Sequence, residues 1–127
     1  GEYPMSNHSI VHVEIPAFDP GKAGTFYADL FNWKIQVDQS FDYHMFQPDP
    51  GPGGGFVKVG EQPPYKPGEV LIYVSTDDID ATLAKAESLG AKTLVPKTEI
   101  PQTGWFAFFS DPTGNRIGLF TGINQPS

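Results

Sequence analysis

Apolar residues occupy every second position near the start of the chain: Val11, Val13 and Ile15. His12 and Glu14 lie between them, so one face of this segment is apolar and the other is polar. A period of two predicts a β-strand, here over residues 10–16. His12 and Glu14 are two residues apart on that strand and therefore share its polar face.

A helix is predicted directly after this strand. Asp19 suits the N-cap, and Pro20 suits the first helical position, where a missing N–H group costs nothing. Apolar residues then recur at intervals of three and four positions: Ala23, Phe26, Tyr27, Leu30 and Phe31. This stripe is typical of an amphipathic helix packed on a sheet.

The rest of the chain repeats this order. Further strands are expected over 33–37, 43–47 and 55–59, and the proline-rich residues 60–68 form a connector. A strand over 69–75, a helix capped by Asp78, and strands over 93–96, 105–110 and 115–121 follow. We predict a single α+β domain of two βαβββ modules, about 8–59 and 69–121. An α+β sandwich with coincidental spacing is the alternative.

The helix–sheet core is expected to draw on the apolar faces of both modules. The residues assigned to it are Val11, Val13, Ile15, Phe26, Leu30, Leu83 and Leu89.

Composition narrows the function. The formal net charge is −7, which disfavours duplex nucleic acid and anionic membrane surfaces as partners. The chain contains no cysteine, so thiolate catalysis and disulfides are excluded, and a cytoplasmic location is expected. No apolar run approaches the roughly 20 residues of a membrane span, and no signal peptide is recognised.

Two segments resemble a known family. They are HVEIPAFDPGKAGTFYADLFNW at 12–33, and VLIYVSTDDIDATLAKAESLGAK at 70–92 followed by FFSDPTGNRIGLF at 108–120. The chain resembles the glyoxalase/bleomycin-resistance/extradiol-dioxygenase, or vicinal oxygen chelate, superfamily. The resemblance implies two βαβββ modules whose curved sheets enclose one cleft.

The resemblance also implies a divalent metal held by one residue from the first and one from the last strand of each module. The four positions fall at His12, Leu71, Gly118 and near Phe56. His12 is the one ligand type among them, and Glu14 adds a second at most. A hard divalent ion needs several oxygen or imidazole ligands. We therefore expect no metal at this site and no cofactor, whereas Leu71→His with Gly118→Glu would supply three ligands together with His12.

The candidate site residues follow from the same placement. His12 and Glu14 are the candidate acid and base, although a packing role for His12 is an open alternative. The remaining residues expected to line the cleft are Phe56, Leu71, Tyr73, Trp105, Arg116 and Gly118. Core packing is the alternative for the aromatic residues, and a surface position is the alternative for Arg116.

Three classes of function stay open. The first is a small-molecule-binding protein without the usual metal, whose ligand is expected to be cationic because the chain is acidic. The second is a metal-independent or atypical lyase or isomerase that uses His12. The third is a non-catalytic structural or regulatory module. A homodimer is expected, partly by resemblance and partly because exposed strand edges need covering.

Overall fold

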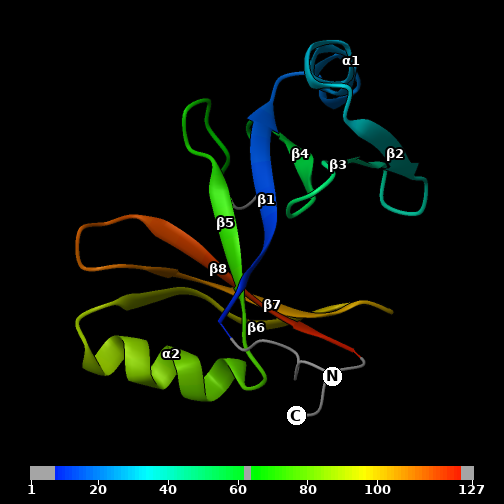
Figure 1. Ribbon diagram of the computed structural model, residues 1–127. Helices are drawn as coiled ribbons and strands as arrows, with labels where there is room; N and C mark the ends of the chain where they lie inside the picture. The colour runs from blue at the N-terminus through cyan, green and yellow to red at the C-terminus, as the bar shows by residue number, and fades with distance from the viewer. Residues whose placement is uncertain (1–7, 62–63, 124–127) are drawn as a thin grey trace. The chain divides into compact units, whose positions relative to one another are not determined.

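The computed structural model describes residues 8–61 and 64–123. The chain divides into two compact units, one comprising Val11–Leu71 and the other running from Ile72 onward together with the start of the first strand. Each unit contains a sheet and one helix, so the predicted α+β class and the βαβββ order are confirmed (Figure 1). Neither helix of the described residues is long and apolar enough to cross a membrane.

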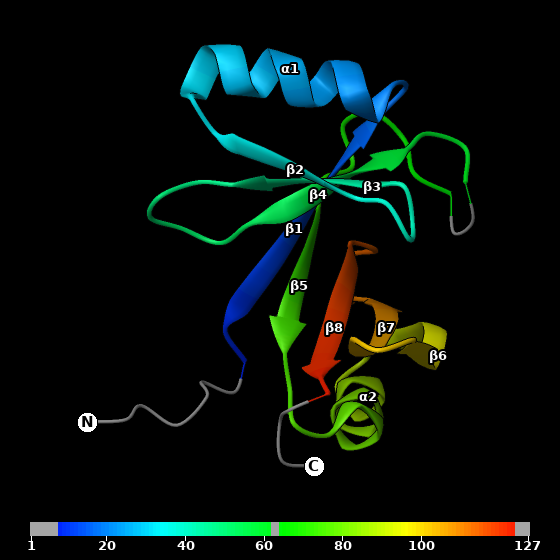
Figure 2. The same ribbon diagram turned by 90° about the vertical axis from the view of Figure 1, so that its right-hand side faces the viewer.

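The first module contains the following elements: β1 (Ile10–Ala17), α1 (Pro20–Phe31), β2 (Lys34–Asp38), β3 (Tyr43–Gln47) and β4 (Gly54–Lys58). The strand order is β2-β3-β4-β1. β1 runs parallel to β4, and the other neighbours are antiparallel. Helix α1 lies along one face of this sheet (Figure 2) and leaves the other face of β1 for polar side chains.

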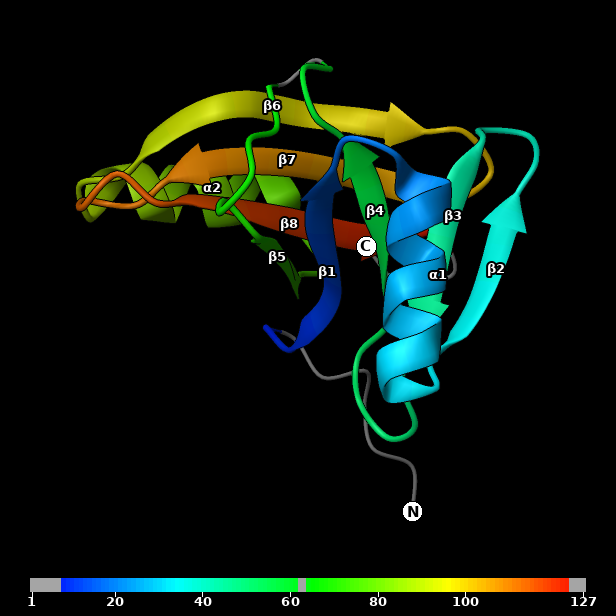
Figure 3. The ribbon, with the colours of Figure 1, turned by 90° about the horizontal axis from the view of Figure 1, so that it is seen from above.

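The second module repeats this arrangement with these elements: β5 (Leu71–Ser75), α2 (Ile79–Ser88), β6 (Lys92–Ile100), β7 (Gly104–Ser110) and β8 (Arg116–Gly122). The order is β5-β8-β7-β6, with β5 parallel to β8. Helix α2 lies under β6, β7 and β8 (Figure 3). β6 continues past Pro96, because an edge strand with register shifts on both sides of Val95 tolerates a residue without an N–H donor.

Local capping signals set where both helices begin. The Asp19 side chain accepts a hydrogen bond from the Lys22 backbone N–H, and the Asp78 side chain accepts one from Ala81. Each bond satisfies a donor that has no partner within the helix. The two predicted N-caps are thus confirmed.

The core differs from the prediction on α1. Phe26 and Leu30 are 56% and 58% exposed, and Val11 is exposed as well. Tyr27 and Ala23 pack on the sheet instead, beside Gly24, whose missing Cβ lets the helix approach Ile35 closely. The apolar stripe is wider than the contact, so the residues on its edge remain in solvent.

Of the other residues assigned to the core, some are packed in it and one is exposed. Val13 and Ile15 pack against the buried cluster of Ala17, Phe46 and Phe56 in the first module. Leu83 is buried in the second module, whereas Leu89, the C-cap residue of α2, is 70% exposed.

Candidate functional site

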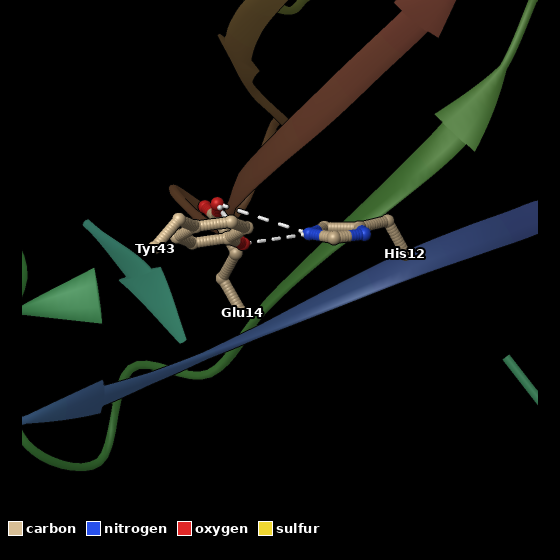
Figure 4. A network of polar contacts seen from close by, with 3 residues as sticks. All are labelled: His12, Glu14 and Tyr43. Atoms are coloured by element: carbon tan, nitrogen blue, oxygen red, sulfur yellow. Dashed lines mark hydrogen bonds and ion pairs between the residues drawn. The ribbon is translucent and has the colours of Figure 1, made fainter. Parts of the chain in front are cut away.

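Three polar side chains meet on the face of the first sheet that α1 does not cover. The Tyr43 hydroxyl lies 2.8 Å from His12 Nε2 and donates a hydrogen bond of 2.9 Å to Glu14 Oε2. His12 Nε2 and Glu14 Oε2 are 4.0 Å apart, so the hydroxyl bridges them (Figure 4). The expected pairing of His12 with Glu14 on one strand face therefore includes a third member that comes from β3.

Strand register brings Tyr43 to β1. Gly55 on β4 is paired with Glu14 on one side and with Met45 on the other. A Cβ atom on Gly55 would overlap the Tyr43 ring. The missing side chain at Gly55 thus lets the Tyr43 ring lie across β4 and reach the carboxylate on the next strand.

Burial keeps two of these groups neutral. Desolvation lowers the pKa of His12 from its ordinary value of 6.5. Desolvation also raises the pKa of Tyr43, and the charge of Glu14 and its hydrogen bond add to this shift. Because the single hydroxyl proton is donated to Glu14, the His12 contact requires His12 Nε2–H to donate to the Tyr43 oxygen. This tautomer makes Nδ1 the acceptor atom of the imidazole.

A pocket of about 630 Å³ opens beside His12 within the first module. The residues that line it include Lys34, Gln36, Met45, Gln47, Gly53 and Gly54. Among these lining residues, Lys34 is the one with a fixed charge. The pocket thus offers donors and acceptors around an apolar patch, with an imidazole at one side.

The predicted residues of the second module lie in and around one strand pair. Tyr73 is paired with Gly118 across β5 and β8, and a Cβ on Gly118 would come within 2.5 Å of Tyr73 Cδ2. Arg116 lies 5.6 Å from the centre of the Phe108 ring. Leu71 and Tyr73 are both buried. The structure thus brings Tyr73 and Gly118 into direct contact.

Phe56 and Trp105 pack in the cores of their modules, which is the alternative that the sequence left open for both. Phe56 packs in the helix-covered core of the first module, with its ring 5.1 Å from Phe46 and 5.6 Å from Tyr27. Trp105 packs against the core formed under α2. Successive strand residues point to opposite faces, so the polar-face position on β4 belongs to Gly55, one residue before Phe56.

Comparison with known proteins identifies the family. The model of the Glyoxalase/Bleomycin resistance protein/Dioxygenase superfamily matches residues 9–119. The chain belongs to this superfamily. A solved structure of a variant of Streptomyces coelicolor methylmalonyl-CoA epimerase, in complex with 2-nitronate-propionyl-CoA, superposes with a TM-score of 0.65. It is 18% identical and covers 96% of this chain and 99% of that one, which shows a shared fold.

Curated relatives carry related names. A Didymella fabae protein named "Glyoxylase-like domain-containing protein" is 33% identical over 118 residues, 86% of this chain and 90% of that protein. The Mycobacterium bovis protein named "Putative glyoxylase CFP32" is 27% identical over 124 residues, 85% of this chain and 43% of that protein. The chain thus spans less than half the length of the mycobacterial relative.

The superfamily's metal positions do not carry a fitting ligand set here. The last-strand positions are Gly55 and Gly118, and a tyrosine ring occupies the space beside each one. Within residues 8–61 and 64–123, no three His, Cys, Asp or Glu side chains form a group that could hold a metal ion. The absence of metal binding itself stays a prediction.

Sequence reasoning missed Tyr43 and most of the pocket lining. A signal for Tyr43 was present, because a tyrosine on the middle strand and a glycine on the next can form a ring-on-glycine contact. Recognising it requires the pairing of β3 with β4, which depends on contacts between separate strands.

Proposed function

We propose that this chain is a small-molecule-binding protein of the superfamily that works without the usual metal ion. The observation that carries the proposal is the pocket beside His12, together with the hydrogen-bonded group of His12, Tyr43 and Glu14. The neutral imidazole of His12 lines this pocket and would contact the ligand. Met45 would contact an apolar part of the same ligand.

Ligand charge is subject to two opposing influences. The net charge of −7 attracts cations at long range, whereas Lys34 lies in the pocket lining. We propose a cationic organic ligand that is held mainly by hydrogen bonds and apolar contact. Affinity for matched cationic and anionic compounds, measured at low and high salt, tests this. Tighter binding of the anionic compound at both salt concentrations would contradict the proposal.

Native mass spectrometry of protein purified without chelator tests the function itself. A retained small molecule is expected in the unmodified protein and in His44→Ala, but not in His12→Ala. His44 is the matched control, since it contacts Asp42 and lies near Gly21 at the start of α1, away from the polar face. A compound screen by thermal shift on the same three proteins supplies the ligand if none is retained. Equal shifts in all three proteins would place binding elsewhere.

The polar group also favours a second candidate, a metal-independent lyase or isomerase. Neutral His12 would accept a proton from a carbon next to a carbonyl, and the resulting imidazolium would be stabilised by the Tyr43–Glu14 pair. Solvent deuterium exchange into the ligand is the readout. Exchange that is lost in His12→Ala, with a rate that falls as pH drops below His12's lowered pKa, favours the enzyme. Neither binding nor exchange in any protein would favour the structural or regulatory module.

A further inference from the structure

We propose that Tyr43 closes a latent divalent-metal site in the first module. Its hydroxyl occupies the point between His12 and Glu14 where a cation would bind, and its ring occupies the space that a side chain at position 55 would need. The proposal does not depend on whether the pocket binds a small molecule.

The distances around the hydroxyl fit a hydrogen bond and not a cation. The hydroxyl oxygen lies 2.8 Å from His12 Nε2 and 2.9 Å from Glu14 Oε2. A zinc ion would lie about 2.0–2.2 Å from the same two atoms. Two ligands at a tetrahedral angle are then separated by about 3.3 Å, compared with the observed 4.0 Å. A small rotation of either side chain would close this difference once the hydroxyl is gone.

The buried carboxylate supports the same conclusion. Glu14 is 8% exposed, and a buried carboxylate is costly without a compensating partner. The Tyr43 hydroxyl donates a hydrogen bond to this carboxylate at the point where a metal ion between His12 and Glu14 would lie. His12 then completes the chain by donating to the same oxygen. Removing Tyr43 leaves a histidine and a glutamate that face one space, which is half of an ordinary zinc ligand set.

The ring has a separate steric effect. Gly55 lies beside Glu14 on the adjacent strand, so a carboxylate introduced there would point toward the same space. The Tyr43 ring fills that space, because even a Cβ atom on Gly55 would overlap it. A third ligand at position 55 therefore requires that the ring be removed first.

The second module shares the contact of a tyrosine ring with a last-strand glycine, although Leu71 and Tyr73 stand there in place of His12 and Glu14. Tyr73 is paired with Gly118 as Glu14 is paired with Gly55, and the Tyr73 ring lies over the glycine. The ring comes from the first strand in this module and from the third strand in the other. In both modules, the last-strand position on the face away from the helix lacks a side chain and is covered by a tyrosine ring.

Zinc titration by calorimetry tests the proposal, with circular dichroism to confirm folding. The double variant Tyr43→Ala/Gly55→Glu supplies three ligands with His12 and Glu14. We expect it to bind one Zn²⁺ at a protein concentration where the unmodified protein gives no binding heat. Adding His12→Ala should abolish that binding. Tyr43→Phe with Gly55→Glu is the matched control, because it keeps the ring, and no binding is expected.

A second variant tests the proposal if the double variant folds poorly. Tyr43→Ala alone removes the closure without adding bulk, and it should bind Zn²⁺ weakly in a manner that needs His12. Stoichiometric Zn²⁺ binding by the unmodified protein, lost in His12→Ala, would overturn the proposal. A folded Tyr43→Ala protein that binds no more Zn²⁺ than the unmodified one would overturn it as well. Ligand binding to the pocket is measured separately, so these outcomes are distinguishable from failure of the proposed function.

Discussion

At the scale of single residues, two glycines matter because each leaves the space that a tyrosine ring occupies. At Gly118, even an alanine Cβ would lie 2.5 Å from Tyr73 Cδ2, which is closer than van der Waals contact allows. Gly118→Ala is therefore expected to lower the free energy of unfolding by about 1–3 kcal/mol, as overpacking does.

A double-mutant cycle checks this prediction by denaturant unfolding. In the Tyr73→Ala background the ring is absent, so adding Gly118→Ala should cost much less than it does alone. Gly114→Ala is a poor control, since Gly114 has a positive φ and its substitution is strained for another reason. Additive costs for Gly118→Ala and Tyr73→Ala would show that the ring contact does not restrict this position.

Asp111 gives a pH prediction. The pKa of its carboxyl is lowered from the ordinary value of 3.8, chiefly by hydrogen bonds from Asn115 and also by those from Gly114 and Thr113. A group whose pKa is lower in the folded state stabilises the fold above its unfolded pKa. That contribution is lost as pH falls through the lowered folded value.

The direction of this pH dependence is checked by measuring the unfolding midpoint of the unmodified protein and of Asp111→Ala at several pH values. The unmodified protein should be more stable at neutral pH, and the difference should shrink as pH is taken below 3.8. Asp29→Ala, an exposed helical aspartate, serves as the comparison. A difference that grows on acidification would contradict the assigned direction.

At the scale of elements, helix α1 shows that only some apolar residues of its stripe contact the sheet. Tyr27 stacks on Phe56 and Trp33, whereas Phe26 and Leu30 lie at the outer edge of the apolar stripe. Tyr27→Ala should cost about 3–5 kcal/mol of unfolding free energy, as large aromatic truncations in cores do. Phe26→Ala should cost under about 1 kcal/mol, because Phe26 is 56% exposed. Denaturant unfolding of the two variants measures this, and equal losses would contradict the packing.

At the scale of the whole molecule, we propose that the chain forms a homodimer. β2 and β6 are edge strands of their modules' sheets, and unpaired edges invite another strand or a cover. Light scattering should give twice the chain mass of 13.9 kDa at micromolar concentrations. A single species of 13.9 kDa across the same range would contradict the proposal.

The sequence by itself determined the order and type of the elements, because those signals are local. Alternation identified β1, and Asp19 and Asp78 fixed the starts of the helices through bonds to residues three positions away. The same two-residue spacing put His12 and Glu14 on one face of β1. The segments at 12–33, 70–92 and 108–120 also pointed to the correct family.

Only the tertiary structure decided which side chains meet. The sequence left both a cleft position and core packing open for Phe56 and Trp105, and the structure packs both side chains in the helix-covered cores. Tyr43 joins His12 and Glu14 because β3, β4 and β1 pair in a particular register and Gly55 leaves room above β4. Register arises from contacts between residues far apart in the chain. A periodic pattern within one strand shows which residues share a face, but not which residue of the next strand each one is paired with.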